Sequence, residues 1–492
     1  MRPPALTHID TPQSACGFAL AWGDITPPPN IYHRMWGAAK HERATGIHRP
    51  LRATVAVFAA AGLPPSPPAR QLLLALDHCT LGATELEQLL AHISAATGQP
   101  RETILVAFSH THGAGLMGLE RASLPGGDLI AGYLKSVAER AAALVQEALA
   151  KLRPATIVYG TGHCDLAGHR DFWDEARQQF VCGFNPAERA DDTVLVARVT
   201  GTDGKLLATV VNYACHPTTL AWENTLISPD FPGAMREVIE QATGAPCLFL
   251  QGACGELGPR EGFVGDTAVA DRNGRQLGYA ALSALTALPE AGTRFEYAGP
   301  VISGATLGAW KHEPLLDPEA QRKQLWQHWR WHEPLPYRPG QPPPEQIAAD
   351  LKKFQDEEQV ARANGDTQRA AECRAMVERK TRLQHRLGQL PPGSTFPLQV
   401  ALWRIGDAFW LVAQGESYSQ LQTELRARFP QATIVVTSIA ADWGAAYLPP
   451  RQLYDTGIYQ ETIAVVEAGS LEQLIESVAQ RVDESLRNEW AS

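Results

Sequence analysis

Two histidines separated by one residue follow an apolar run in the first quarter of the chain. The run TILVAF (103–108) leads into SHTH, which contains His110 and His112. An imidazole can bind a metal ion or carry a proton near neutral pH. On an extended chain, side chains two residues apart point to the same face, about 6.5 Å apart along the strand. One ring could therefore bind a metal while the other faces a substrate, or both could bind.

Polar residues also follow four further apolar runs, which are typical of buried strands. A single such residue is more commonly a hydrogen-bonded loop side chain, but residues that follow several strand ends can share one site, because sites form outside the carboxyl ends of strands. The runs and the residues after them are KLLATVVNYA (205–214) with His216, PCLFL (246–250) with Cys254 and Glu256, AFWLVA (408–413) with Glu416, and ATIVVTSIA (432–440) with Tyr447.

The donor atoms of these residues are typical of a catalytic metal site. His110, His216, Glu416 and Tyr447 offer nitrogen and oxygen ligands, and three protein ligands with one open position describe catalytic zinc. Such an ion polarises a carbonyl and activates water, which favours hydrolysis. The same donors also suit manganese or iron. Taken alone, Glu416 could start a helix, Tyr447 could be a packing residue, and Cys254 could be a buried thiol.

Helical patterns separate the strand-like runs, and this alternation predicts an α/β fold. Residues 128–152, 231–243 and 470–490 have apolar residues at helical spacing. The strand runs lack a clean polar alternation, which is typical of strands covered on both faces. We therefore expect a mixed, mostly buried sheet flanked by helices.

Residues 310–392 interrupt this pattern. They are rich in charge, Gln and Trp, with a proline-rich stretch followed by a predicted helical hairpin that breaks at 363–366. We expect a helical insertion over 310–392 in a catalytic α/β domain formed by 1–309 and 393–492. The insertion could be a lid, an oligomer contact through which the chain forms a homo-oligomer, or a solvated decoration.

Composition limits the classes of partner. The net charge of −10 argues against nucleic acid, although a local basic patch stays possible because net charge does not report distribution. No window approaches the roughly 18 apolar residues of a membrane span. The eight cysteines are scattered and the N-terminus has no signal-peptide pattern, so we expect free thiols and a cytoplasmic protein.

The ordered set of motifs resembles the catalytic domain of the neutral/alkaline non-lysosomal ceramidases, which are zinc-dependent amidases. The matching stretches cover most of residues 17–470 outside the insertion. They are GFALAWGDITPP (17–28), ATGIHRPLRATVAVF (44–58), SHTHGAG (109–115), NYACHPTTL (212–220), SPDFPGAM (228–235), FLQGACGELGP (249–259), GES (415–417) and AYLPPRQLYDTGIYQ (446–460).

The resemblance implies roles for individual residues. It implies one zinc ion held by His110, His216, Glu416 and Tyr447. It implies that His112 is a second active-site histidine. Arg170, in AGHRDF, falls where the family has an active-site arginine.

Two departures from the family change the expected chemistry. Gly258 occupies the position of the family's nucleophilic serine, and no counterpart of the family's C-terminal immunoglobulin-like domain follows the tyrosine motif. We therefore expect a small, soluble substrate rather than membrane-bound ceramide.

Metal-activated water is the expected nucleophile in the absence of that serine. We expect a zinc-dependent hydrolase that cleaves an amide or ester bond, with His112 as first choice and Glu256 as second choice of base, and Arg170 as a stabiliser of the oxyanion. Cys254 is a rival nucleophile. The alternative functions are a neutral ceramidase acting on N-acyl sphingosine, and a metal-containing binding protein without catalysis.

Overall fold

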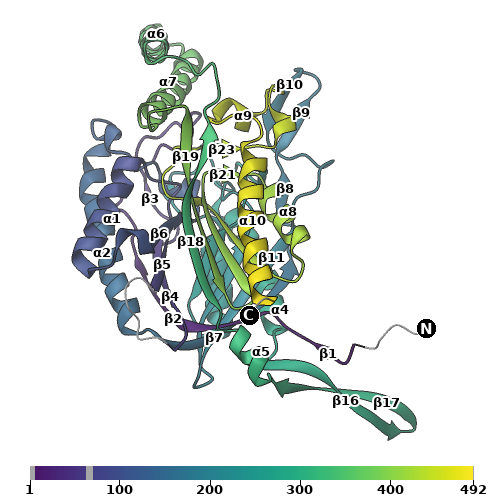
Figure 1. Ribbon diagram of the computed structural model, residues 1–492. Coiled ribbons are helices and arrows are strands. Elements are labelled where there is room, and N and C mark those ends of the chain that lie inside the picture. Colours follow the sequence, from purple (N-terminus) through teal and green to yellow (C-terminus); the bar gives the residue numbers. More distant parts are fainter. Residues whose placement is uncertain (1–5, 63–69, 491–492) are drawn as a thin grey trace.

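The apolar runs of the sequence form strands of a large mixed sheet (Figure 1). The computed structural model describes residues 6–62 and 70–490. In this part of the chain the sheet has twelve strands. In order across the sheet they are β14 (Cys247–Gln251), β12 (Leu206–Tyr213), β11 (Thr193–Gly201), β7 (Arg153–His163), β2 (Gln13–Asp24), β4 (Arg52–Ala59), β5 (Arg70–Leu76), β6 (Ile104–Phe108), β22 (Thr433–Ala440), β20 (Ala408–Gln414), β19 (Thr395–Ile405) and β18 (Trp326–Pro336).

The five predicted strands are all present, as β6, β12, β14, β20 and β22. Parallel pairing joins β12 to β14, β5 to β6 and β20 to β22, while the other neighbours pair antiparallel. The predicted mixed α/β class is therefore confirmed.

The sheet folds over, so that its two halves face each other across a shared core. Trp410 of β20 lies in this core with its ring centroid 5.0 Å from that of Phe58 in β4. Its indole N–H donates to the Tyr159 hydroxyl of β7 at 3.2 Å. Buried side chains of β2, β4, β7 and β11 contact those of β19, β20 and β22 in the same cluster. This two-layer core holds the strand ends of both halves in fixed relative positions.

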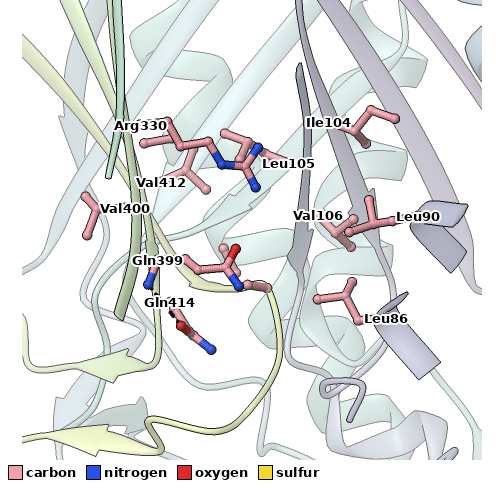
Figure 2. A pocket seen from close by; sticks show the side chains of 13 residues that line it. Leu86, Leu90, Ile104, Leu105, Val106, Arg330, Gln399, Val400, Val412 and Gln414 are labelled. Carbon is pink, nitrogen blue, oxygen red and sulfur yellow. Dashed lines mark hydrogen bonds between the residues drawn. The ribbon is translucent and has the colours of Figure 1, made fainter. Parts of the chain in front are cut away.

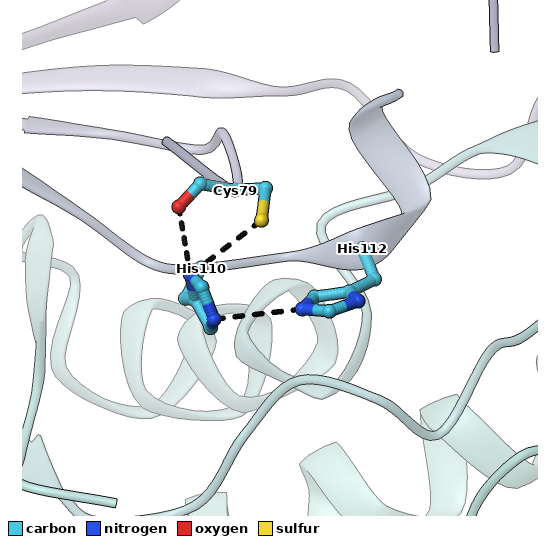
Figure 3. A group of neighbouring side chains, drawn as sticks. All are labelled: Cys79, His110 and His112. Atoms are coloured by element: carbon cyan, nitrogen blue, oxygen red, sulfur yellow. Dashed lines mark hydrogen bonds between the residues drawn. The ribbon is translucent and has the colours of Figure 1, made fainter. Parts of the chain in front are cut away.

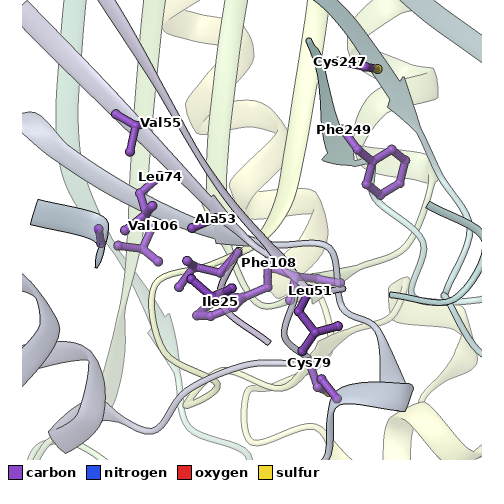
Figure 4. Close-up of a cluster of buried hydrophobic side chains, with 14 of the residues drawn as sticks. Ile25, Leu51, Ala53, Val55, Leu74, Cys79, Val106, Phe108, Cys247 and Phe249 are labelled. Atoms are coloured by element: carbon purple, nitrogen blue, oxygen red, sulfur yellow. The ribbon is translucent and has the colours of Figure 1, made fainter. Parts of the chain in front are cut away.

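Helices cover the two outer faces of the folded sheet. One outer core packs under α1 to α4, and Figure 4 shows part of it, with Cys79 at its edge beside Phe108 and Leu51. The other outer core packs under α8 and α10. Within the described ranges, no helix is long and apolar enough to cross a bilayer. The helices are α1 (Ala83–Thr97), α2 (Ile130–Ala150), α3 (Phe231–Thr243), α4 (Thr267–Thr286), α5 (Asp317–Arg322), α6 (Pro344–Ala363), α7 (Thr367–Gly388), α8 (Gln420–Arg428), α9 (Tyr459–Ile463) and α10 (Ser470–Trp490).

The three helices predicted outside the insertion match α2, α3 and α10. Helix α3 has the predicted bounds because both ends are marked: the Asp230 side chain accepts from the Phe231 N–H, and Gly244 closes the helix at φ 68°. A left-handed C-terminal residue favours glycine, which has no Cβ to clash.

The segment 310–392 contains the predicted helical hairpin, α6 and α7, but its tryptophan-rich part differs from the expected connector. Residues 326–336 form β18, which pairs with β19 at the edge of the sheet. Burial alternates along this strand, with Trp329 and Trp331 more buried than Arg330 and His332. Charged and proline residues concealed this period-two pattern, and proline is tolerated because β18 is an edge strand.

Short ladders complete the fold. A three-stranded arm projects from the body in Figure 1, and a two-residue ladder joins segments that follow β20 and β22. The strands concerned are β1 (His8–Ile9), β16 (Thr293–Ser303) and β17 (Ala305–Pro314) in the arm, and the pairs β3 (Gly46–Ile47) with β13 (Leu226–Ile227), β8 (Ala167–His169) with β15 (Leu257–Pro259), β9 (Asp171–Asp174) with β10 (Gln179–Cys182), and β21 (Glu416–Ser417) with β23 (Tyr447–Leu448).

A small cavity lies at the seam where the two halves of the sheet meet (Figure 2). Its volume is about 20 Å³, room for about one water molecule. Its wall is mainly aliphatic, with Arg330, Gln399 and Gln414 as polar members. The Gln414 side-chain oxygen accepts from the Gln399 N–H at 3.0 Å. The cavity shares no lining residue with the polar strand ends singled out in the sequence.

A buried carboxylate anchors α7 to the body of the protein. Glu378 of α7 is 2% exposed. It accepts hydrogen bonds from Arg121 at 3.0 Å, from Arg382 at 2.8 Å and from the Tyr32 hydroxyl at 3.4 Å. Burial by itself raises the pKa of this carboxyl, but the Arg382 and Arg121 guanidinium groups outweigh burial and lower the pKa to about 2. The ionised form is thus the one that holds the helix.

The substitution Glu378→Gln should therefore loosen α7. Removing one partner from a buried ion pair costs about 3–5 kcal/mol, and we expect a loss of that order in the free energy of unfolding measured by urea denaturation. Because the pKa is about 2 in the folded state and about 4.3 in the unfolded state, this contribution is complete above pH 4.3. It disappears as the pH falls toward 2.

Glu372→Gln is the matched control, because Glu372 pairs with Arg369 on the exposed side of the same helix. Surface pairs contribute about 0–1 kcal/mol. Equal urea midpoints for the two variants would contradict the anchoring role of Glu378. Hydrogen exchange over 344–388 would show whether the lost stability is local to the hairpin.

Candidate metal centre

Side chains from four strand ends meet at one edge of the folded sheet. His110 lies just after β6 and His216 just after β12. Glu416 and Tyr447 are directly paired in the β21–β23 ladder, in which the Glu416 N–H donates to the Ala446 carbonyl at 2.7 Å. The structure thus brings together the four residues predicted as metal ligands, from segments more than 300 positions apart.

The His110 ring is held by the loop after β5. Its Nδ1 donates to the Cys79 carbonyl at 2.7 Å (Figure 3). This leaves Nε2 directed toward Glu416 Oε2 at 3.4 Å. The backbone of His110 is left-handed, with φ 66°. The extended geometry expected for the His-x-His pair is therefore wrong at this residue. Strained backbone of this kind persists where the surrounding structure enforces it, often at functional sites.

The His216 ring is held in the same way by the glycine-rich loop, residues 252–258, which follows β14. Its Nδ1 contacts the carbonyls of Cys254 at 2.7 Å and Leu257 at 3.1 Å. Complete burial, followed by the nearby Arg170 charge, lowers the pKa of His216 to about 3. The ring is therefore neutral at pH 7, donates from Nδ1, and presents a lone pair at Nε2.

The space between these rings and the carboxylate favours a cation. His216 Nε2 lies 2.9 Å from Glu416 Oε2 and 3.4 Å from the Tyr447 hydroxyl. A nitrogen lone pair facing a carboxylate oxygen is repulsive unless positive charge lies between them. Burial lowers the pKa of His110, but Cys79 and Glu416 outweigh it and raise that pKa, which shows the same preference for positive charge.

The spacing of the ligand atoms fits a metal ion. The ligand atoms of His110, His216 and Glu416 all lie within 4.8 Å of one another. With metal–ligand bonds of about 2.0–2.1 Å, ligand atoms of a tetrahedral site lie about 3.3 Å apart. The measured 2.9 and 3.4 Å separations bracket that value. The residues present therefore fit a small divalent metal ion such as zinc.

A second group of metal-binding atoms overlaps the first. Cys79, His110 and His112 also lie within mutual reach, but Cys79 Sγ approaches His110 at Nδ1, 3.6 Å away, whereas His112 approaches at Nε2 (Figure 3). Since that Nδ1 already donates to a carbonyl, the group with His216 and Glu416 is the better metal site.

Arg170 lies beside the cluster. It follows β8, which pairs with β15 of the glycine-rich loop. Its guanidinium donates to the Gly255 carbonyl at 2.5 Å and to the Tyr447 hydroxyl at 3.0 Å, and lies 3.4 Å from His216 Nε2. It thus brings a fixed positive charge to the edge of the centre.

His112 lies next to His110, with its ring against an aromatic residue. Its Nε2 is 3.5 Å from His110 Nε2, and Trp36 covers it with ring centroids 5.1 Å apart. Trp36 also contacts Phe263 at 5.6 Å and Trp222 at 6.2 Å. These three aromatic side chains form an apolar wall next to His112. Burial and then the neighbouring imidazoles lower the pKa of His112 well below its usual value, so the ring is neutral at pH 7.

Glu256 faces away from the cluster and toward α8. Its carboxylate accepts from the Ser419 backbone N–H at 2.9 Å and from the Ser419 hydroxyl. Burial raises the pKa of this carboxyl to about 7. These contacts fix the start of α8 to the glycine-rich loop.

The rival thiol lies in an unfavourable environment. Cys254 is fully buried, burial raises its pKa, and its sulfur accepts from Gln251 at 3.0 Å. Gly258 lies near the centre: a Cβ at this position would have the Thr218 hydroxyl at 3.6 Å and Arg170 Cδ at 3.8 Å as its nearest neighbours. Position 258 therefore has room for a serine side chain, but in this chain it is occupied by glycine.

Sequence reasoning missed Trp36, Phe263 and the α7 side chains near the centre. Trp36 precedes β4 in a segment without strand or helix periodicity, so no sequence signal placed it beside His112. Of the aromatic residues near the motifs, Trp222 joins the wall, whereas Trp173 lies in the β9–β10 hairpin and is 40% exposed.

No known family model and no curated protein sequence matches the chain significantly. Solved structures do match. One, described as "Ceramidase complexed with C2", has a TM-score of 0.63 at 16% identity, over 98% of this chain and 76% of that one. Neutral ceramidase from Pseudomonas aeruginosa has a TM-score of 0.60 at 16% identity, over 96% and 74%. Over nearly its whole length, this chain has the fold of the neutral ceramidases.

Proposed function

We propose that the protein is a zinc-dependent amidohydrolase that cleaves the amide bond of a small substrate. The observation that carries the proposal is the convergence of His110 Nε2, His216 Nε2 and Glu416 Oε2, with both rings held through Nδ1 by backbone carbonyls. The ceramidase fold supports the reaction class.

His110, His216, Glu416 and Tyr447 would hold the ion. When bound, zinc supplies a Lewis acid that polarises the scissile carbonyl and lowers the pKa of water. Because Gly258 offers no hydroxyl and the Cys254 thiol is buried and protonated, water is the nucleophile that remains.

The chain's own residues would move the proton and stabilise charge. His112 is neutral and directed toward His110, so it can accept a proton from the attacking water and return it to the leaving nitrogen. Arg170, fixed by the Gly255 carbonyl and the Tyr447 hydroxyl, would stabilise the developing oxyanion. The wall formed by Trp36, Trp222 and Phe263 would take an apolar acyl group and exclude solvent from His112.

The first prediction concerns the metal. Protein purified without added metal should contain about one zinc ion per chain, and a chelator should abolish turnover of short N-acyl amides. His216→Ala should lower zinc affinity by more than the roughly 10- to 100-fold that accompanies the loss of a partner of a metal ligand. Metal content and chelator competition measure this.

His328→Ala is the matched control, because His328 is exposed on β18. Turnover that survives complete demetallation would refute the proposal. Hydrolysis of a fluorescent ceramide as fast as that of short N-acyl amides would instead overturn the small substrate.

The second prediction concerns His112. Because general base catalysis contributes about 10²–10⁴-fold, His112→Ala should lower kcat by about that factor while the zinc content stays at the wild-type level. Kinetics and metal analysis on the same preparation test this. A kcat within about threefold of wild type would remove His112 from the proton path.

A further inference from the structure

The last turns of α7 bring a buried arginine toward the candidate metal centre. Arg386 is 6% exposed, and among the described residues its Nε has no hydrogen-bond partner and its guanidinium forms no ion pair with a carboxylate. An arginine stays charged under all physiological conditions. A buried charge without a partner is costly, so this guanidinium is suited to an anion supplied from outside the chain.

Several neighbouring arginines are neutralised by this chain's own carboxylates, whereas the buried Arg170 donates to a carbonyl and a hydroxyl. Arg121 and Arg382 bond Glu378, and Arg34 bonds Glu42 at 2.8 Å. Arg386 is therefore the arginine of α7 near the centre that has no carboxylate partner among the described residues.

The neighbours of Arg386 on α7 contact loops that build the centre. His385 has its ring centroid 5.9 Å from that of Trp443, in the loop that leads to Tyr447. Gln389, which bonds His385 at 3.0 Å, accepts at 3.2 Å from the Ala83 N–H, close to the loop of Cys79. Burial lowers the pKa of Arg386, while the charges of Tyr459, Glu416 and Tyr447 act against that shift. Arg386 is therefore close enough to Glu416 and Tyr447 to respond to their charges.

Indole groups near the centre add unused donors. The N–H groups of Trp443 and Trp36 are buried without hydrogen-bond partners among the described residues. An indole N–H can only donate, as can a guanidinium. A buried donor left unsatisfied costs about 1–3 kcal/mol. The centre is therefore bordered by donors that lack acceptors, and a ligand rich in acceptor oxygens would satisfy them.

We propose that Arg386 binds a carboxylate of the substrate, so that the preferred substrates are amides carrying a free carboxylate, such as N-acyl amino acids. The proposal rests on the proposed function. A single guanidinium fork matches one carboxylate in geometry and charge. The helical hairpin α6–α7 would then determine substrate specificity, because its residue Arg386 binds the negatively charged group of the substrate.

The test compares matched substrates in the holoenzyme. N-acetylglycine and its neutral counterpart N-acetylglycinamide differ only in the charge of the leaving group, and a monosuccinyl amide carries the carboxylate on the acyl side instead. Arg386→Ala should raise KM for whichever acid the wild type prefers by about 10- to 100-fold. It should change kcat/KM for the neutral amide by less than about threefold and leave the zinc content unchanged.

Arg379→Ala is the control, since Arg379 is exposed on α7, and it should leave both substrates unaffected. A structural arginine would lower the melting temperature when replaced, whereas loss of an unpaired buried charge should leave the melting temperature unchanged or raise it. Arg386→Lys keeps the charge without the fork and should recover part of the affinity. Equal losses for acid and amide would overturn the assignment, as would a wild type that does not prefer acids.

Calorimetric titration separates this inference from the proposed function. If zinc is bound but no amide is hydrolysed, the proposed function fails. Arg386 is then still supported if N-acetylglycine or the succinyl amide binds wild type and not Arg386→Ala. If neither acid binds wild type more tightly than N-acetylglycinamide, the carboxylate assignment fails, whether or not neutral amides are hydrolysed.

Discussion

Two hydrogen bonds from imidazole Nδ1 atoms to backbone carbonyls determine which ring nitrogens face the candidate metal position. The Cys79 carbonyl belongs to the loop after β5 and the Cys254 carbonyl to the loop after β14, so each ring is held by a strand end other than its own. A ring fixed in this way has one nitrogen left to offer. Both rings offer it toward Glu416, and Arg170 and His112 lie next to the position so defined.

The glycine-rich loop holds the neighbouring side chains through its backbone carbonyls and strand pairing. Its carbonyls bind the His216 ring and the Arg170 guanidinium, and its strand β15 pairs with β8. None of these contacts needs a side chain at Gly258. The architecture around the centre can therefore stay intact in a chain without a serine there, which is why a fold shared with ceramidases at 16% identity does not by itself define the nucleophile.

The sequence predicted those parts of the fold and the site that leave a pattern in neighbouring residues, and it missed those that depend on tertiary contacts. The runs that became β6, β12, β14, β20 and β22 are buried on both faces, so continuous apolar stretches located them, and their ends then indicated which polar residues should meet. The strand β18 was missed because tryptophans alternate there with charges and prolines. The left-handed backbone of His110 and the unpaired state of Arg386 follow from tertiary contacts, and neither residue differs locally from its neighbours in sequence.

The direct pairing of Glu416 with Tyr447 bears on whether the fold depends on the proposed metal ion. The ladder is made of backbone hydrogen bonds, and the rings opposite it are fixed by carbonyls on a sheet with a large apolar core. In small zinc domains the ion drives the chain to fold, whereas here an extensive apolar core stabilises the fold around the proposed ligands. Removal of the proposed ion should therefore leave a folded protein that can bind metal again. The metal bound in a cell would then depend on which ions are available and on how fast they exchange.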